Sequence, residues 1–420
     1  MNSVCINGIS HTQEEILAGR NLKLLSPELM DFLRDWFSES PVFHVRTSGS
    51  TGIPKQIPVL KKHAVNSAKA TCSYLGLKRG DNALLCLSTQ YIAGKMMIVR
   101  AISTGLNLWT VPVDGHPLKP FLNSPHPHFH FAAMVPLQVI NSLQTENERD
   151  LLAQIDKIII GGAPIDPQLE ADLQFFPNTF LSTYGMTETL SHIAMRPLNG
   201  PQASPHYTTL PGVRIQTNTD ETLTIDFPDI GVTQLKTHDR CQIVSVSRDR
   251  SQNFKILGRI DNVINSGGIK IQPEEIEAKL AFLHPILCAV TSLPHPVLGE
   301  TIVLLISTQT SQNRPADAEI SKKLNWKRVS DRTDFLQLIS SRLTKYQLPK
   351  AIGQVEVLPF TPNGKIDRIA LKHLAFKVFG ENPFKNRNTK SILFAWQIYA
   401  QSTGKLVSTV RVTNKLGEKK

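Results

Sequence analysis

Lys157-Ile-Ile-Ile-Gly161-Gly162-Ala163-Pro164 is a short apolar run that ends in two glycines. A continuous apolar run of this length is typical of a strand that is buried on both faces of a sheet. Ligands of parallel sheets bind at the carboxyl ends of the strands, where this glycine turn would lie. The bare backbone could accept a nucleotide base there, although a plain tight turn would have the same sequence.

Similar apolar runs alternate with helical stretches along the first half of the chain. We expect strands at 83–87, 106–113, 130–135 and 157–160, with helices at 61–75, 94–103 and 136–143. This alternation predicts an α/β fold with a largely parallel sheet. The preceding residues 1–45 are interpreted as a helical lead-in, with Ser26-Pro27 at the start of a helix.

The pattern of polar and apolar residues changes twice beyond residue 205. Short strands that alternate polar and apolar residues predict a β subdomain within the first domain. We therefore divide the chain into a large α/β domain at 1–259, a small mobile α+β C-terminal domain at 260–375 and a basic tail at 376–420 that could be disordered. Within the tail, residues 391–400 could form an amphipathic helix.

The composition limits the class of protein and of partner. The 420 residues include 46 lysines and arginines against 35 acidic residues, and the net charge of +11 favours anionic partners such as nucleotides or acidic substrates. The basic residues are dispersed and carry no nucleic-acid-binding signature, so we do not expect nucleic acid as a partner. Five widely spaced cysteines predict neither a disulfide framework nor a zinc site. We recognise no signal peptide or transmembrane segment and expect a cytoplasmic protein.

The densest chemical signal is Thr47-Ser48-Gly49-Ser50-Thr51-Gly52-Ile53-Pro54-Lys55. Its glycines expose backbone amides, its four hydroxyls add hydrogen-bond donors, and its lysine adds a positive charge. Together these groups suit a polyphosphate. The order of residues is not that of a Walker A loop, because Ile53-Pro54 stands before the lysine. A flexible linker would have a similar composition.

Three further segments carry polar groups of interest. In Ser182-Thr183-Tyr184-Gly185-Met186-Thr187-Glu188-Thr189, the carboxylate could bind Mg²⁺ and the tyrosine could stack on a purine, although a helix-capping turn would suffice. The segment from Gly258 to Lys270 contains a glycine pair that permits close approach of a ligand. Thr361-Pro-Asn-Gly-Lys365-Ile-Asp-Arg displays one lysine, and a lone surface lysine is usually solvated.

In this order, the segments resemble the adenylate-forming superfamily of acyl- and aryl-CoA synthetases, peptide synthetase adenylation domains and luciferases. The resemblance extends from about residue 44 to 371. It includes TSGSTGIPK, GGAP, YGMTET, Thr237-His238-Asp239, GRIDNVINSGGIKIQPEEIE and PNGKIDR. It implies an enzyme that uses ATP and Mg²⁺ to convert a small carboxylic acid to an acyl-adenylate and then passes the acyl group to coenzyme A.

The resemblance also implies a role for each matching position. The loop at 47–55 would fold over the ATP phosphates, Thr187 would contact phosphate, and Glu188 would hold Mg²⁺. Gly161, Gly162, Ala163, Pro164 and Tyr184 would border the adenine, while Asp239 and Arg259 would bind the ribose. Lys365 would bridge the carboxylate and the α-phosphate, Asp261 would be the hinge of the small domain, and Gly267 and Gly268 would line the pantetheine tunnel.

Other segments are similar to the o-succinylbenzoate–CoA ligases of bacterial menaquinone biosynthesis. They are Tyr91-Ile-Ala-Gly94-Lys95-Met-Met, Met134-Val-Pro136-Leu-Gln138 and YGMTETLSHIAMR. That substrate has two carboxylates, of which one is activated and the other needs a cationic or donor-rich partner. The candidates for this partner are Lys95, Arg100, Ser191 and His192. The lysine and arginine could instead be solvated, and the histidine could be structural.

Two departures from the family pattern stand out. The stretch before the phosphate loop is much shorter than usual, and His238 occupies a position where a small residue is commoner. Two alternatives to a CoA ligase stay open: an adenylating enzyme that loads another acid onto a carrier protein, and a nucleotide-binding regulatory protein without turnover. The sequence does not predict the oligomeric state.

Overall fold

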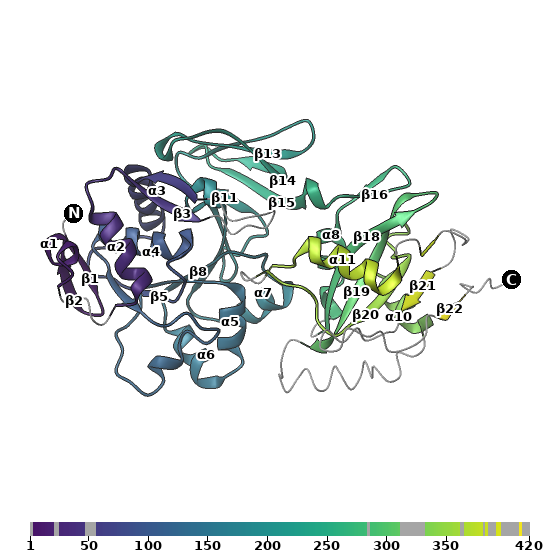
Figure 1. Ribbon diagram of the computed structural model, residues 1–420, viewed down its shortest axis with the longest axis horizontal. Coiled ribbons are helices and arrows are strands. Elements are labelled where there is room, and N and C mark those ends of the chain that lie inside the picture. The colour runs from purple at the N-terminus through teal and green to yellow at the C-terminus, as the bar shows by residue number, and fades with distance from the viewer. Residues whose placement is uncertain are drawn as a thin grey trace. The chain divides into compact units, whose positions relative to one another are not determined.

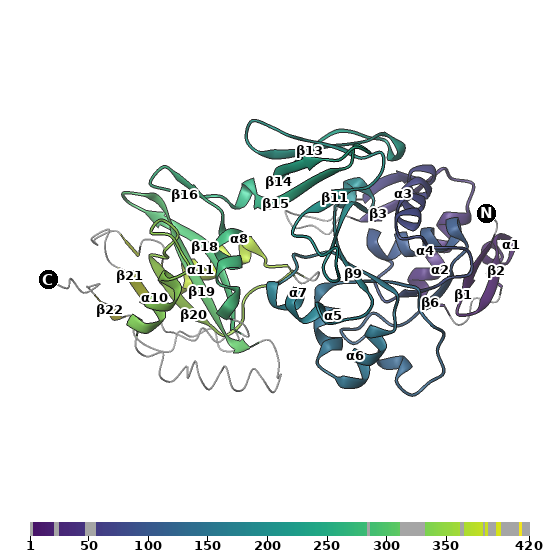
Figure 2. The same ribbon diagram turned by 180° about the vertical axis from the view of Figure 1, so that it is seen from behind.

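The computed structural model describes residues 3–20, 25–46, 56–283, 286–310, 332–361, 365–380, 383–384, 392–395 and 411–413. The chain divides into two compact units (Figures 1 and 2). The first contains residues 1–165, 169–237 and 241–255, and the second contains 166–168, 238–240 and 256–420. The predicted boundaries after residues 259 and 375 stay a prediction.

Six strands of the first unit run parallel to their neighbours. In spatial order they are β1 (Ser3–Ile6), β6 (Asn107–Thr110), β5 (Asn82–Leu85), β7 (Phe131–Met134), β8 (Lys157–Ile160) and β9 (Thr179–Gly185). The apolar runs of the sequence therefore became the central strands, as predicted. Because these strands are parallel, their carboxyl ends lie at one edge of the sheet, and the residues that follow them can converge there.

Further strands continue the same sheet at both ends. β2 (Ile9–Thr12) pairs antiparallel with β1. Beyond β9 come β10 (His192–Pro197), β11 (Tyr207–Thr209), β15 (Gln252–Arg259), β14 (Val232–Val246), β13 (Thr222–Phe227) and β12 (Arg214–Thr217). The predicted fold class is confirmed, and the structure adds that the β subdomain is continuous in hydrogen bonding with the parallel strands.

Helices cover both faces of the parallel strands (Figures 1 and 2). One face packs against α5 (Pro136–Leu143), α6 (Glu146–Ala153) and α7 (Pro167–Leu173), with Leu84, Ala132 and Ile158 in that core. The other face carries α3 (Lys61–Tyr74), α4 (Ile92–Thr104) and α2 (Pro27–Phe37), and Ser26 caps the last of these. A separate hairpin joins β3 (Val42–Arg46) to β4 (Gln56–Leu60). Burial on both faces explains why the strands are apolar throughout.

The interpretation of residues 1–45 as a helical lead-in was incomplete. Besides α1 (Gln13–Leu17) and α2, the segment contains the hairpin of β1 and β2, whose turn holds Asn7 at φ 51°. Asn7 also hydrogen-bonds the backbone and the side chain of Thr110. The hairpin was missed because its first strand is stabilised by pairing with β6, about a hundred residues away.

The second unit has a sheet of its own, covered on both faces. Its strand order is β17 (Ile269–Ile271), β16 (Ile264–Ser266), β19 (Gly299–Thr310), β20 (Ala351–Val355), β21 (Ile392–Ala395) and β22 (Arg411–Thr413), with β18 (Ile286–His295) also paired to β19. Alternation along β19 is regular. Ile302, Leu304 and Ile306 face α8 (Pro273–Lys279) and α10 (Arg332–Ser340), whereas Val303 and Leu305 face α11 (Arg368–Phe379).

The expectation of a disordered or helical tail is wrong for the two short segments that the structure describes there. Residues 392–395 form β21, which pairs in parallel with β20, and residues 411–413 form β22. An apolar Ile-Leu-Phe-Ala run next to an open strand edge satisfies backbone groups that would otherwise lack partners. The rest of the predicted amphipathic helix lies outside the described residues.

Candidate functional site

The glycine turn predicted after the fourth apolar run lies at the carboxyl edge of the first sheet. Gly161 follows β8 directly and donates its amide to the carbonyl of Met134 at 3.1 Å. Gly162 has a left-handed φ of +88°, which favours glycine. A Cβ at position 161 would collide with the hydroxyl of Thr183, which donates to the carbonyl of Ile160 at 3.2 Å. The turn is therefore held against β9 with its backbone bare.

Three aromatic rings form a cluster beside this turn, here called the aromatic cluster. Tyr184 lies 5.9 Å from Tyr207 and 5.7 Å from Phe254 between ring centroids, and the last two rings are 5.8 Å apart. The hydroxyl of Tyr207 is 2.8 Å from that of Ser182, and Phe254 is fully buried. The half-buried ring of Tyr184 is thus fixed in place and offers a flat surface to a planar ligand.

The acidic motif forms a tight turn between β9 and β10. Its centre is a short 3₁₀ helix, Thr187–Thr189, in which the Thr189 hydroxyl accepts from the Met186 amide at 3.0 Å. Leu190 follows with φ 62° and ψ −36°, although it is neither glycine nor exposed. Such a conformation costs about 1–3 kcal/mol and is found mostly at functional sites. The turn leaves Glu188 exposed and Thr187 half-buried.

Arg100, Ser191 and His192, three of the predicted substrate contacts, are brought together in a buried cluster. The Arg100 guanidinium donates from Nη2 to the Ser191 hydroxyl at 2.6 Å. Nδ1 of His192 is 3.3 Å from the same hydroxyl, and its Nε2 is 2.9 Å from the hydroxyl of Thr71 on α3. Arg100 is only 2% exposed and His192 only 6%. We call Thr71, Arg100, Ser191 and His192 the arginine cluster.

No acidic side chain forms an ion pair with Arg100 among the residues that the structure describes. Its Nε is a buried donor without a hydrogen-bond partner in that part of the chain. Desolvation lowers the pKa of Arg100 to about 10, with Cys72 acting in the opposite direction. Desolvation and the nearby guanidinium hold the pKa of His192 well below its usual range. Burying a guanidinium away from water costs free energy unless an anion pairs with it. The arginine cluster is therefore suited to bind a carboxylate.

Lys95 takes a different partner. Its ammonium lies 4.7 Å from the centroid of the Phe32 ring on α2, a cation–π contact. The structure therefore does not show it with the arginine cluster, and its predicted role in substrate binding stays a prediction. Sequence reasoning missed Thr71, Tyr207 and Phe254, because their contribution depends on contacts between segments far apart in the chain.

In the second unit, the predicted ribose-binding and hinge residues form one hydrogen-bonded group. Arg259 donates to Asp239 at 3.3 Å and to Asp261 at 2.7 Å, and His238 lies 2.8 Å from Asp261. Desolvation acts to raise the pKa of Asp261, but hydrogen bonds from His238 and Arg259 outweigh it and lower the pKa. The unusual histidine noted in the sequence is therefore a direct partner of the predicted hinge.

Lys365 precedes α11 in the second unit. Its amide donates to the Thr361 hydroxyl at 3.2 Å, and its carbonyl accepts from the Thr361 amide at 2.7 Å. Although the residue has a large exposed surface, desolvation lowers the pKa of the ammonium, with Asp239 opposing and Arg259 adding to the shift. Gly267 and Gly268, at φ +60° and +82°, form the two-residue turn between β16 and β17. The loop at 47–55 lies outside the described residues.

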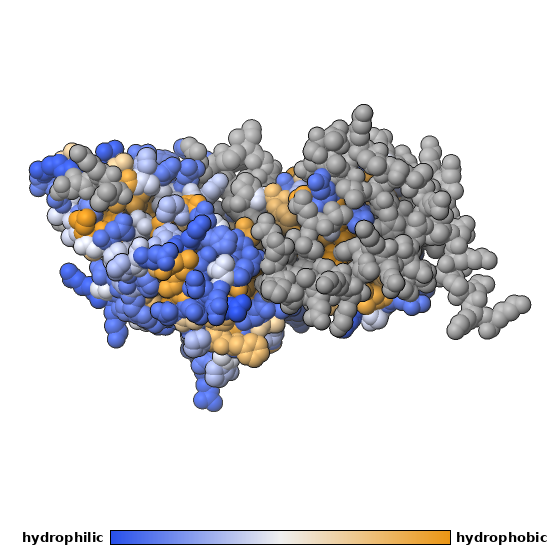
Figure 3. Space-filling view, turned by 90° about the horizontal axis from the view of Figure 1, so that it is seen from below, coloured by the Kyte–Doolittle hydropathy of each residue, from blue (hydrophilic) through white to orange (hydrophobic). Residues whose placement is uncertain are grey.

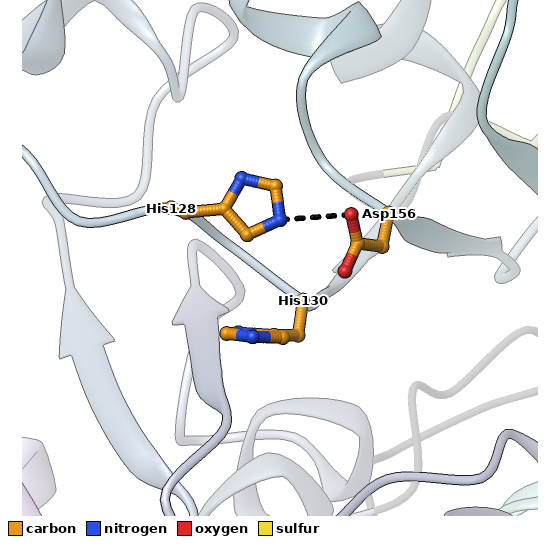
Figure 4. A group of neighbouring side chains, drawn as sticks. All are labelled: His128, His130 and Asp156. Carbon is orange, nitrogen blue, oxygen red and sulfur yellow. Dashed lines mark hydrogen bonds and ion pairs between the residues drawn. The ribbon is translucent and has the colours of Figure 1, made fainter.

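A second polar cluster lies at the opposite, amino-terminal edge of the parallel strands. Figure 4 shows His128 and His130, just before β7, next to Asp156, just before β8. Nε2 of His128 is 2.8 Å from Asp156. The amide of Asn82 donates to Nδ1 of His130 at 3.0 Å, so the neutral ring carries its proton on Nε2, which lies 3.8 Å from Asp81. That nitrogen is then a donor to carboxylates rather than a metal ligand. We therefore assign this cluster to hydrogen bonding between neighbouring strands.

Hydrophobic residues on the face in Figure 3 lie in separate patches among hydrophilic ones. Among the described residues, no helix is both long enough and apolar enough to cross a bilayer.

Comparisons with known proteins agree with these observations. A model of the AMP-binding enzyme family matches residues 25–224. A 2-succinylbenzoate–CoA ligase from Lactococcus lactis is 25% identical over 359 residues, which are 80% of this chain and 72% of that protein. A probable 2-succinylbenzoate–CoA ligase from Mycobacterium tuberculosis is 27% identical, over 78% of this chain and 82% of that one. The crystal structure of an acyl-CoA synthetase (AMP-forming)/AMP-acid ligase II-like protein from Dyadobacter fermentans is 31% identical, with a TM-score of 0.52, over 83% of this chain and 93% of that one.

Proposed function

Because the chain belongs to the AMP-binding enzyme family, we propose that it is an AMP-forming acid–CoA ligase whose substrate is o-succinylbenzoate or a closely similar aromatic diacid. The cosubstrates are ATP and coenzyme A, and Mg²⁺ accompanies the nucleotide. A cytoplasmic location belongs to the same proposal. The observation that carries the choice of substrate is the buried arginine cluster, in which no described carboxylate pairs with Arg100 and its Nε has no hydrogen-bond partner among the described residues.

The reaction has two steps. A carboxylate oxygen of the acid attacks the α-phosphorus of ATP, a P–O bond to the acid forms, the α–β anhydride bond breaks, and pyrophosphate leaves. The sulfur of coenzyme A then attacks the acyl carbon, a C–S bond forms, the bond to AMP breaks, and the thiol proton is released. Both steps bring negative groups together, so cationic and hydrogen-bond-donating groups must stabilise the charge that develops.

The geometry of the first unit supports a nucleotide and an acid at one sheet edge. The bare turn at Gly161–Gly162 and the ring of Tyr184 provide a flat surface for adenine. Thr187 and Glu188 lie in the turn that follows β9, where Thr187 would contact phosphate and Glu188 would hold Mg²⁺, a hard ion that prefers oxygen ligands. The strained Leu190 connects this turn to the arginine cluster within two residues. Nucleotide and acid would therefore be held by consecutive parts of one turn.

The arginine cluster selects the acid. One carboxylate of a diacid reacts, and the other would pair with Arg100 and complete its hydrogen bonds. A bidentate arginine–carboxylate pair in a dry site is strong and geometrically specific. A monocarboxylic acid would leave the buried cation unpaired. The cluster would thus reject acids without a second carboxylate, because the cost of the unpaired charge would persist in the complex.

The second unit would supply Lys365 to the first step. Its ammonium would bridge the attacking carboxylate and the α-phosphate, while Asp239 and Arg259 would bind the ribose. Gly267 and Gly268 carry no side chains of their own at the turn that would receive the pantetheine arm. Asp261 would be the hinge that exchanges these two arrangements.

A panel of carboxylic acids tests the proposal. Pyrophosphate release is measured for each acid with ATP and Mg²⁺, and thioester formation is measured after coenzyme A is added. We expect o-succinylbenzoate to give both products. Adenylate formation without a thioester at any coenzyme A concentration would instead favour transfer to a carrier protein. ATP binding without acid-dependent pyrophosphate release would favour a regulatory protein and refute the proposal.

A further inference from the structure

The segment that carries Lys365 is attached to the second unit through Arg368, three residues further along. Nη1 and Nη2 of Arg368 donate to the two carboxylate oxygens of Glu277 on α8, both at 2.7 Å. Nη1 also donates to the carbonyl of Val290 on β18 at 2.9 Å. One side chain therefore joins the first turn of α11 to both a helix and a strand.

Glu277 binds both Arg368 and the backbone of β18, which restrains the position of the arginine. The same Oε1 that accepts from Arg368 also accepts from the amide of Val290 at 2.7 Å. The side chains of Arg368 and Glu277 are only 23% and 19% exposed. Desolvation acts to lower the pKa of Arg368, but the hydrogen bonds and charge of Glu277 outweigh it and raise the pKa. Desolvation raises the pKa of Glu277, with the hydrogen bond and charge of Arg368 opposing it, and the two side chains have the geometry of a bidentate arginine–carboxylate pair.

The two residues between Lys365 and Arg368 are also held by hydrogen bonds, so that fixing Arg368 restrains the backbone of Lys365. Asp367 caps α11 by accepting from the amides of Ile369 and Ala370. Its own amide donates to the carbonyl of Pro359 at 3.0 Å, and Ile366 forms an antiparallel bridge with Phe360. The Thr361 hydrogen bonds then fix the backbone of Lys365 itself. Few freely rotating backbone bonds remain between the anchored arginine and the lysine.

We propose that Arg368 is a positioning residue for the acyl-adenylation step: with Glu277 it fixes the backbone from which Lys365 reaches the reacting groups. This inference rests on the proposed function of Lys365. It goes beyond that function because Arg368 acts only through the lysine and contributes nothing to the thioester-forming step. Misplacement of a catalytic group by about 1 Å can reduce a rate roughly 100-fold, so the loss of this anchor should be visible in kinetics.

Separate assays of the two half-reactions test the inference. Adenylation is followed as acid-dependent pyrophosphate release, and thioester formation is followed from chemically prepared acyl-adenylate and coenzyme A. We expect Arg368→Lys, which keeps the charge but loses the bidentate geometry, to lower the adenylation rate roughly 10- to 100-fold. Thioester formation should stay within about twofold of the wild type, and the milder Glu277→Gln should shift adenylation in the same direction.

The matched control is Lys372→Met on the same helix. Lys372 pairs with Glu300 at 3.1 Å, so the substitution removes an ion pair of α11 without touching the segment at 359–368. It should leave both half-reactions unchanged. Equal loss of both half-reactions in Arg368→Lys would indicate general damage to the unit, and no loss in either would show that Arg368 does not position the lysine; each result would overturn the inference.

A measurement without substrates separates this inference from the proposed function. Limited trypsin cleavage after Lys365 reports the mobility of its backbone, and the released peptides are identified by mass. Positioning by Arg368 predicts faster cleavage there in Arg368→Lys and an unchanged rate in Lys372→Met. If the wild type activates no acid, the proposed function fails, and unchanged cleavage in Arg368→Lys would then still refute the anchoring.

Discussion

Arg368 and Arg100 are both largely withdrawn from water, and they differ in whether a carboxylate of the described residues pairs with them. Arg368 in the second unit has Glu277 as a bidentate partner, and its pKa is raised. Arg100 in the first unit is more deeply buried, has a hydroxyl and a thioether as partners, and its pKa is lowered to about 10. We interpret the first charge as one that holds the fold, and we propose that the second is available to bind a ligand.

The largest expected difference concerns stability. Arg368→Met should lower the free energy of unfolding by about 3 kcal/mol, because it leaves the largely buried Glu277 without its partner. Arg100→Met should leave it within about 1 kcal/mol of the wild type or raise it, because it removes a buried charge that has no acidic partner in the described part of the chain. Urea unfolding of the two variants measures both values. A larger loss in Arg100→Met than in Arg368→Met would break the comparison.

Ligand-induced stabilisation should follow the same division. At o-succinylbenzoate concentrations about 100 times Kd, the wild type should gain about 2.7 kcal/mol of stability. Arg368→Met should keep most of this gain, although the variant is less stable than the wild type without the acid. Arg100→Met should lose the gain. Thermal unfolding with and without the acid checks this. A retained gain in Arg100→Met would show that the acid binds elsewhere.

A smaller effect is expected from pH. The folded-state pKa of His192 is depressed, so the folded protein keeps the ring neutral while the unfolded chain takes up a proton as the pH falls through about 6.5. Stability from this group is therefore complete above pH 7 and is lost on acidification. His192→Gln should flatten the fall in stability between pH 7 and pH 5 relative to the wild type. Parallel pH profiles of the two proteins would contradict the assignment of a buried neutral histidine.

The sequence predicted the parallel strands well, since strands buried on both faces are apolar without interruption. It also named Arg100, Ser191 and His192 as candidate substrate contacts, and the structure brings these three side chains together, while their contact with a substrate stays a prediction. It missed the hairpin of β1 and β2 and the strand β21, because both are stabilised by pairing with distant strands rather than by their own composition. It could not show that no carboxylate of the described residues pairs with Arg100, since the surroundings of a side chain depend on packing. The aromatic cluster was missed for the same reason, because its rings come from three separate strands.

The central claim is that Arg100 binds the carboxylate of the substrate that does not react. The most direct test compares kcat/KM for o-succinylbenzoate with that for its two monocarboxylate analogues, in the wild type and in Arg100→Met. The wild type should prefer the diacid roughly 100-fold over the better analogue, as expected for a charge-assisted pair worth about 2–3 kcal/mol, and the variant should prefer it less than about fivefold. An undiminished preference in Arg100→Met would contradict the account.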